Sequence, residues 1–263
     1  MTADRSAPIG HPLRIALIAG EASGDVLGAS LIQAIKLRHP DADFFGIGGP
    51  KMIAEGLVSA YEQERLAVRG AVEVIKHLPE ILRIRRGILS KLKDWRPDVL
   101  VGIDAPDFNL PIERQLKRAG IPTVHYVSPT VWAWRRGRAK RIIASVNQLL
   151  CLFPFEPACY KGQAIDPVFI GHPLADEIPL TLDRLQQRSA LDLPHAAPLI
   201  TLMPGSRQSE LDFHAQLFVE TANRIAAELP EAYFIVPLTT PATRDRFDAA
   251  LREFGTQGLR LRI

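Results

Sequence analysis

The sequence predicts an α/β fold with a doubly wound, mostly parallel sheet, and three observations lead to this prediction. Short apolar runs of strand length recur along the chain. Segments with the apolar spacing of a helix separate these runs. Several runs end at glycine or at an acidic residue, as residues 13–19 do before Gly20. This alternation of strand and helix is typical of a parallel sheet covered by helices on both faces.

The first part of the chain is expected to form an N-terminal Rossmann-like domain over residues 1–173. Its strands are predicted at 13–19, 44–47, 98–103, 122–127, 148–152 and 168–170. Its helices are predicted at 25–38, at 66–95 with a break at Pro79, at 110–119, and in a basic segment that ends near 147. Gly120 suits the end of the third helix, because glycine readily takes the left-handed conformation found there.

The second part of the chain repeats the alternation after a proline-bearing linker at 174–198, in which we expect one short helix. Strands are predicted at 199–203, 233–237 and around Leu259, and helices at 209–229 and 241–254. Three strands make a small sheet, and no closing helix follows the last one. Residues 199–263 are therefore expected to be a partial C-terminal domain with a truncated sheet.

The composition indicates a globular protein and argues against a membrane-spanning helix, a signal peptide and a zinc site. Apolar residues make up 47% of the 263 residues, which is ordinary for a globular chain. No apolar run approaches the roughly 18 residues of a membrane-spanning helix, and residues 1–12 lack the apolar core of a signal peptide. We therefore expect a cytoplasmic protein. The spacing of Cys151 and Cys159 suits no common zinc site, so reduced, buried thiols are expected and no metal.

Basic residues cluster in two segments of a chain whose net charge is only +3. Residues 76–96 hold seven lysines and arginines against two acids, and residues 135–141 hold five with no acid. Such clusters indicate anionic partners, namely phosphates, an acidic membrane surface or nucleic acid.

The first strand runs into the loop Ala19-Gly20-Glu21-Ala22-Ser23-Gly24-Asp25, which we interpret as the start of an active site. Glycines allow close approach of a ligand, and the helix N-terminus that follows offers free N–H groups. The loop matches neither the dinucleotide fingerprint nor a P-loop. A tight turn capped by Ser23 or Asp25 is the alternative interpretation. Glu21 favours a sugar hydroxyl over a phosphate as the ligand.

Another acidic loop, residues 102–109, follows the strand predicted at 98–103. Asp104 comes directly after that apolar run, so burial is expected to raise the pKa of its carboxyl, as a general base for an alcohol requires. Asp107 and Asn109 could instead cap the next helix, with Asp104 bonded to the loop. We favour capping for Asp107 and the chemical role for Asp104.

Three further strand ends carry candidate binding residues. Trp132 and Trp134 precede the basic helix, where aromatic rings can stack on bases, bind sugars or meet lipid, although one of them is expected in the core. Residues 205–207, Gly-Ser-Arg, could seat a diphosphate or simply cap a helix. His172 could donate to a ligand phosphate, although a lone loop histidine is more often structural.

These motifs, taken in order, resemble the lipid-A-disaccharide synthase family. The segments that carry the resemblance are 19–25 (AGEASGD), 102–109 (GIDAPDFN), 125–134 (HYVSPTVWAW), 171–173 (GHP) and 204–207 (PGSR). The resemblance extends over essentially the whole chain from about residue 13. It implies a GT-B glycosyltransferase with two Rossmann-like domains, of which the second is incomplete in this chain.

The resemblance also implies an activity. The family transfers 2,3-diacylglucosamine from UDP-2,3-diacylglucosamine to 2,3-diacylglucosamine 1-phosphate, with inversion and without a metal or other cofactor. It implies that Asp104 is the base for the acceptor 6-hydroxyl. Ser23, with Glu21, Gly24 and Asp25, would line the acceptor or sugar pocket, and Gly205, Ser206 and Arg207 would hold the UDP diphosphate.

Several partners follow from the same resemblance. Residues 66–95 are expected to meet the inner membrane as an interfacial helix, which makes the enzyme peripheral on the cytoplasmic side. The apolar residues expected in acyl chains are Val68, Val72, Val74, Ile75, Leu78, Ile81 and Leu82. The full-length protein is expected to form a homodimer. In the family, the donor site is completed by a later segment, so this chain is expected to be a fragment.

Two other classes of function remain open on the sequence alone. A UDP-sugar epimerase of the same fold would not require acyl chains on its substrate. A non-enzymatic binder of anionic membranes or nucleic acid would use the two basic segments and bind any polyanion in a salt-sensitive way. The acidic strand-end loops argue against the second class, and therefore against a nucleic-acid partner.

Overall fold

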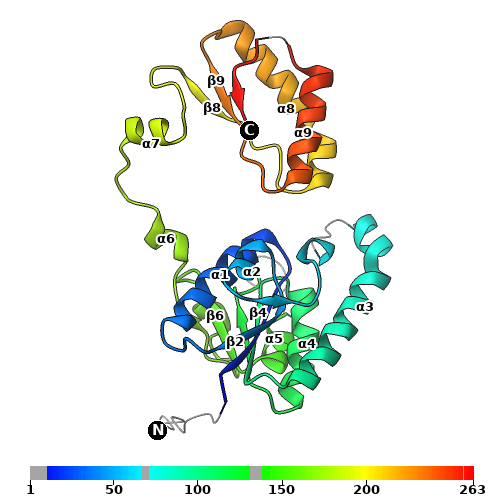
Figure 1. Cartoon of the computed structure of the whole chain (residues 1–263). Coiled ribbons are helices and arrows are strands. Elements are labelled where there is room, and N and C mark those ends of the chain that lie inside the picture. The colour runs from blue at the N-terminus through cyan, green and yellow to red at the C-terminus, as the bar shows by residue number, and fades with distance from the viewer. Residues whose placement is uncertain (1–10, 67–70, 131–137, 257) are drawn as a thin grey trace. The chain divides into compact units, whose positions relative to one another are not determined.

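The computed structural model describes residues 11–66, 71–130, 138–256 and 258–263, with the backbone alone at 71–76 and 138. The chain divides into two compact units, Met1–Ile178 and Pro179–Ile263. Each unit holds a parallel sheet flanked by helices, as the sequence predicts (Figure 1).

The sheet of the first unit has seven parallel strands in the order β3-β2-β1-β4-β5-β6-β7. The strands are β1 (Arg14–Ala19), β2 (Asp43–Ile47), β3 (Val58–Ser59), β4 (Val99–Ile103), β5 (Thr123–Tyr126), β6 (Gln148–Cys151) and β7 (Val168–Phe169). The order reverses between β1 and β4, where consecutive crossovers leave in opposite directions. This is the switch point at which sheets of this kind bind ligands.

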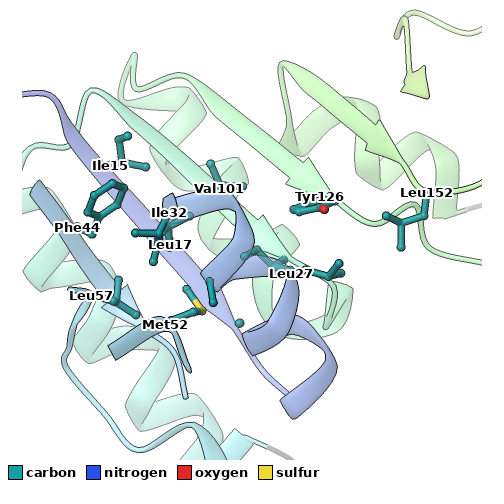
Figure 2. Packing of buried hydrophobic residues seen from close by; sticks show 13 residues of the cluster. Ile15, Leu17, Leu27, Ile32, Phe44, Met52, Leu57, Val101, Tyr126 and Leu152 are labelled. Atoms are coloured by element: carbon teal, nitrogen blue, oxygen red, sulfur yellow. The ribbon is translucent and has the colours of Figure 1, made fainter. Parts of the chain in front are cut away.

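Alternate residues of the central strand β1 point to opposite faces of the sheet, because the side-chain period of a strand is two. Ile15 and Leu17 pack under the helices α1 (Ala22–Lys36) and α2 (Pro50–Ala54), as Figure 2 shows for the core on this face. Ala16 and Ile18 pack on the other face, against α3 (Ala71–Trp95) and α4 (Pro106–Arg118). A third cluster packs α5 (Arg138–Ser145) against β6.

Helix α3 corrects one prediction, because it runs through Pro79 without the expected break. Proline removes one backbone hydrogen bond and normally kinks or ends a helix. In α3, Ile84, Ile88 and Leu92 lie fully buried against the sheet. This packing on the sheet fixes the course of the helix beyond the proline.

Smaller elements complete the first unit and were not predicted. They are α2, β3, the 3-10 helices η1 (Gln63–Leu66) and η2 (Pro157–Tyr160), and α6 (Pro173–Glu177). The expected linker carries α7 (Arg184–Ala190) in addition to most of α6, so it holds two short helices rather than one. None of the helices in the described parts of the chain is both long and apolar enough to span a membrane.

The second unit has a three-stranded parallel sheet in the order β10-β9-β8. Its elements are β8 (Leu199–Thr201), α8 (Gln208–Glu228), β9 (Tyr233–Ile235), α9 (Pro241–Phe254) and β10 (Leu261–Arg262). One core made from both helices and all three strands holds the unit together, with Phe234 and Phe247 fully buried at its centre.

Candidate active site

The two acidic loops of the first unit meet at the carboxyl ends of β1 and β4. A Cβ atom added to Gly20 would lie 2.8 Å from the Cβ atom of Ala105, closer than real Cβ atoms approach. The absence of a side chain at Gly20 therefore lets the first loop lie directly against the second. The structure thus brings together the two segments that the sequence predicts to form the site.

The helix after the first loop begins at Ala22, three residues earlier than predicted. Ser23 and Asp25 therefore lie inside its first turns, and neither occupies the N-cap position, which is Glu21. The interpretation of Ser23 or Asp25 as the cap of this helix is wrong for that reason. Ser23 is exposed and Glu21 is partly exposed, so both remain accessible to a ligand.

The structure gives Asp25 a structural role, while its contact with substrate stays a prediction. The residue is only 3% exposed, and its carboxylate binds backbone N–H groups. One oxygen accepts the backbone N–H groups of Gly49 and Met52, each at 2.9 Å, and the other accepts that of Lys51 at 3.0 Å. These are the free N–H groups at the start of α2, so Asp25 caps that helix from a distant part of the chain.

Gln63 also holds the first loop, and no sequence pattern around it indicates this role. Its side chain is 8% exposed, and Nε2 donates to the carbonyl oxygens of Ala19 at 3.0 Å and Glu21 at 2.9 Å. A Cβ on Gly49 would lie 2.4 Å from Oε1 of Gln63 and 2.6 Å from Oδ2 of Asp25. Glycine at this position therefore lets both side chains pack under the loop.

Gly24 is buried, and its contact with substrate stays a prediction. A Cβ at this position would lie 3.2 Å from the Cβ of Ala19 and 3.6 Å from Cγ2 of Ile103. The residue therefore serves the close packing of α1 on β1 and β4. Glu21 and Ser23 are the two predicted residues of the first loop whose side chains are accessible for direct contact with a substrate.

The second loop has an unusual backbone at the predicted base. Asp104 and Ala105 both take left-handed conformations, with φ of 49° and 41°. Such conformations are costly for residues other than glycine and persist where neighbouring contacts hold them. Asp104 is partly exposed, so the prediction that burial surrounds its carboxyl is wrong, and a ligand can reach the side chain. Asp107 lies inside the first turn of α4, whose N-cap is Ala105, so the favoured capping position is wrong, although the helix dipole favours a carboxylate there.

A buried polar cluster of Asn109, Glu113 and His125 lies next to this second loop. Nδ1 of His125 lies 2.7 Å from Oε1 of Glu113, and both side chains are fully buried. Burial raises the pKa of the Glu113 carboxyl, and the neighbouring His125 offsets part of that increase. Asn109 lies one helical turn before Glu113 and is also fully buried. It is inside α4, so the interpretation of Asn109 as a helix cap is wrong.

The loop after β5 contributes a buried hydroxyl pair, with Ser128 Oγ 2.9 Å from the hydroxyl of Tyr160. Burial raises the pKa of Tyr160, and separately that of Cys151, to about 12. Cys151 is buried as expected, whereas Cys159 is only partly buried, and both thiols are free. Trp132 and Trp134, with their predicted binding role, lie outside the described residues.

His172 lies at the N-cap of α6, where Nδ1 accepts the backbone N–H of Leu174 at 3.1 Å. An accepting Nδ1 places the proton of the neutral ring on Nε2. The structure therefore gives His172 a capping role and leaves Nε2 as the ring nitrogen that carries the proton, while donation to a ligand phosphate stays a prediction.

The Gly205–Ser206–Arg207 turn of the second unit binds an internal anion, the carboxylate of Glu210. Its Oε2 accepts the backbone N–H groups of Ser206 at 2.8 Å and Arg207 at 3.3 Å. Its Oε1 lies 2.8 Å from Nη1 of Arg207. The backbone bond from Ser206 and the charge of Arg207 lower the pKa of Glu210, so the carboxyl is ionised. These are the same donors that the sequence predicts for a diphosphate.

The basic helix α3 presents its charges to solvent. Its exposed basic side chains are Arg83, Arg86, Lys91 and Lys93. Leu78 is 43% exposed and could insert among acyl chains, as expected. Ile81 packs against the core, so the expected insertion of Ile81 is not supported. Val68, Val72, Val74 and Ile75 lie outside the residues whose side chains are described. Among the described side chains, His, Cys, Asp and Glu form no group that could hold a metal ion.

The fold and the loops at the strand ends together define an α/β protein of the GT-B class. The structure superposes on a UDP-GlcNAc 2-epimerase from Neisseria meningitidis with a TM-score of 0.58, at 11% identity, over 95% of this chain and 71% of that one. The corresponding enzyme from Rickettsia bellii gives a TM-score of 0.56 at 16% identity, over 96% of this chain and 68% of that one. At such low identity these likenesses show the fold alone.

A family model described as lipid-A-disaccharide synthetase matches residues 15–260. The chain therefore belongs to the lipid-A-disaccharide synthetase family, as the strand-end motifs predict.

Curated relatives agree with this family assignment. The lipid-A-disaccharide synthase of Chromobacterium violaceum is 52% identical over 250 residues, which are 95% of this chain and 65% of that protein. The same enzyme of Neisseria meningitidis serogroup A is 51% identical over 261 residues, 99% of this chain and 67% of that protein. The chain thus spans about two thirds of the length of these relatives.

Proposed function

We propose that the complete protein containing residues 1–263 is an inverting glycosyltransferase of lipid A biosynthesis. It joins UDP-2,3-diacylglucosamine to 2,3-diacylglucosamine 1-phosphate and releases lipid A disaccharide 1-phosphate and UDP. One observation carries the proposal, namely the contact of the Gly20 loop with the Asp104 loop in a chain of this family.

Asp104 acts as the general base. Its carboxylate takes the proton from the acceptor 6-hydroxyl while the hydroxyl oxygen attacks the anomeric carbon of the donor sugar. The bond between that carbon and the diphosphate oxygen breaks, and UDP leaves with the electron pair. Glu21 and Ser23, on the loop in contact with Ala105, bind hydroxyl groups of the sugar substrates. Partial exposure of Asp104 and Glu21 supports these roles.

The Gly205–Ser206–Arg207 turn binds the UDP diphosphate through two backbone N–H groups and a guanidinium. These donors hold the carboxylate of Glu210, and this supports the assignment because a carboxylate, like a diphosphate, is an anion. His172 Nε2–H is a further donor for a phosphate. Trp134 is proposed to contact substrate on the family resemblance.

Helix α3 is proposed to meet the inner membrane from the cytoplasmic side, since both substrates are lipids. Its exposed arginines and lysines suit anionic headgroups. The complete protein is proposed to form a homodimer, which light scattering at several protein concentrations would test.

The experiment is a mass-spectrometric assay of the complete product of the reading frame containing residues 1–263, called the complete protein below. Incubation with both diacylated substrates is expected to give the disaccharide 1-phosphate and an equal amount of UDP. Absence of both products from a folded preparation would refute the proposal.

UDP-N-acetylglucosamine without acyl chains serves as the control substrate. Conversion of this control to a second UDP-sugar would instead favour the epimerase hypothesis. The fold is shared with epimerases, so the acyl requirement of the substrate separates the two activities.

A further inference from the structure

Asn109 is hydrogen-bonded to Asp104, the predicted base, and to the ends of the neighbouring strands. We propose that Asn109 is the positioning residue of Asp104. Its amide nitrogen Nδ2 donates to the carbonyl oxygen of Asp104 at 2.8 Å. The same nitrogen lies 3.3 Å from the carbonyl oxygens of Ile18 and Ile103, at the ends of β1 and β4. One buried amide therefore joins Asp104 to both strands. The inference rests on the proposed role of Asp104 as the base.

The backbone at Asp104 needs such support. Its left-handed conformation, shared with Ala105, is unfavourable for residues that carry a Cβ atom. The N–H of Asp104 donates to the carbonyl of Tyr126 at 2.9 Å, while its carbonyl accepts from Asn109. The two bonds hold the peptide groups on either side of the Asp104 Cα atom. They thereby fix the direction in which the carboxylate leaves the backbone.

The position of Asn109 itself is fixed by Gly102 and Glu113. A Cβ on Gly102 would lie 2.0 Å from Oε1 of Glu113 and 3.1 Å from the Cβ of Asn109. The lack of a side chain at Gly102 therefore lets α4 approach β4 closely enough for the Asn109 amide to reach the strand ends. The bond of Glu113 to His125, which lies opposite Gly102 in β5, holds α4 in this place.

The two ends of the Asn109 amide differ in their hydrogen bonding, because Nδ2 donates to the carbonyls of Ile18, Ile103 and Asp104. Oδ1 of Asn109 is buried and has no hydrogen-bond partner among the residues that the structure describes. A buried acceptor without a partner is destabilising, and an apolar side chain would avoid that cost. What an apolar side chain cannot do is donate to the carbonyl of Asp104. We therefore assign the amide to the geometry of the base in addition to the hydrogen bonding of the strand ends.

A double-mutant cycle in the complete protein tests this role. Asn109→Asp keeps the shape and replaces the donor with an acceptor, and we expect kcat to fall about 10- to 100-fold with little change in KM. In an Asp104→Asn background the same change should lower kcat by less than about 3-fold, because the group being positioned is already inactive. Unchanged kcat in the single variant, or a full multiplicative loss in the double variant, overturns the proposal.

A second variant covers the case in which Asn109→Asp fails to fold. Asn109→Ser retains a hydroxyl but is too short to reach the carbonyl of Asp104 from the same backbone position. Hydrogen exchange of the Asp104 amide, measured on the 263-residue chain, should be faster in this variant than in the wild type. Unchanged exchange overturns the proposal. This measurement needs no substrate, so it separates failure of the positioning role from failure of the proposed transferase activity.

Discussion

Glu210 and Arg207 form an ion pair, 2.8 Å between Oε1 and Nη1, across the turn predicted to seat a diphosphate. The carboxylate also accepts the N–H groups of Ser206 and Arg207. A bound diphosphate would compete with Glu210 for all of these donors. On the proposed function, the diphosphate therefore displaces the Glu210 carboxylate from this turn.

Removing this competing charge should tighten the binding of UDP. Two unit charges about 4 Å apart repel by about 1 kcal/mol in water, so Glu210→Gln should lower the Kd for UDP about 5-fold in the complete protein. Isothermal titration calorimetry measures the change. Glu228→Gln, an exposed change near the far end of the same helix, should leave the Kd unaltered. Weaker binding in Glu210→Gln would instead mean that Glu210 orients Arg207 for the ligand.

A methyl group at Gly20 should push the two acidic loops apart. The new Cβ would meet that of Ala105 at 2.8 Å, and overpacking of this kind typically costs about 1–3 kcal/mol. Urea denaturation of Gly20→Ala should show this loss in the free energy of unfolding. The double variant Gly20→Ala/Ala105→Gly should recover part of it after the effect of Ala105→Gly alone is subtracted. Strictly additive effects would contradict a direct contact between the loops.

Reversal of two exposed charges on α3 should weaken binding to anionic vesicles. Each basic residue near an anionic membrane surface contributes about 1 kcal/mol, so Arg83→Glu/Arg86→Glu should lower binding at least about 30-fold. Vesicle co-sedimentation of the complete protein measures this effect. Arg114→Glu/Arg118→Glu on α4 changes the net charge equally at exposed positions and is the control. Equal losses in the two variants would exclude a specific role for α3.

Stability should fall as the solution becomes more alkaline. Burial raises the pKa of Cys151 from 9.0, and that of Tyr160 from 10.0, to about 12 in the folded protein. The folded state therefore keeps protons that the unfolded state loses, and the free energy of unfolding decreases as the pH rises from about 9 towards 12. Urea titrations at pH 8 and pH 10.5 would show this decrease. Tyr160→Phe should reduce the slope, and an unchanged slope would contradict the role of Tyr160.

Much of the fold follows from local sequence patterns. The apolar runs before Gly20 and Asp104 predict β1 and β4 within one residue, because fully buried parallel strands are continuously apolar. The two-residue strand β3 and the five-residue helix α2 carry too few residues for a periodic pattern. Their formation depends on pairing with β2 and on capping by Asp25, contacts that join distant parts of the chain.

The site is predictable at the level of loops but not of individual contacts. Strand ends predict Glu21 and Asp104 as neighbours in the first unit, since parallel strands gather their carboxyl ends at one edge, and they predict Arg207 separately in the second unit. Asp25 and Gln63 act through bonds to residues more than 20 positions away, which no local pattern encodes. Glu210 differs from them, because it forms a capping box with Arg207 only three residues away, a local pattern that sequence reasoning missed.

The role of Asp104 as the base is the central claim, and a comparison of kcat between two isosteric variants of the complete protein tests it most directly. Asp104→Asn removes the proposed base, whereas Asp107→Asn alters an exposed carboxylate three residues away, in the first turn of α4. We predict that kcat for disaccharide formation falls by about 100- to 10,000-fold in Asp104→Asn, as loss of a general base does, and by less than about 3-fold in Asp107→Asn. Turnover of folded Asp104→Asn at the wild-type rate would contradict the account.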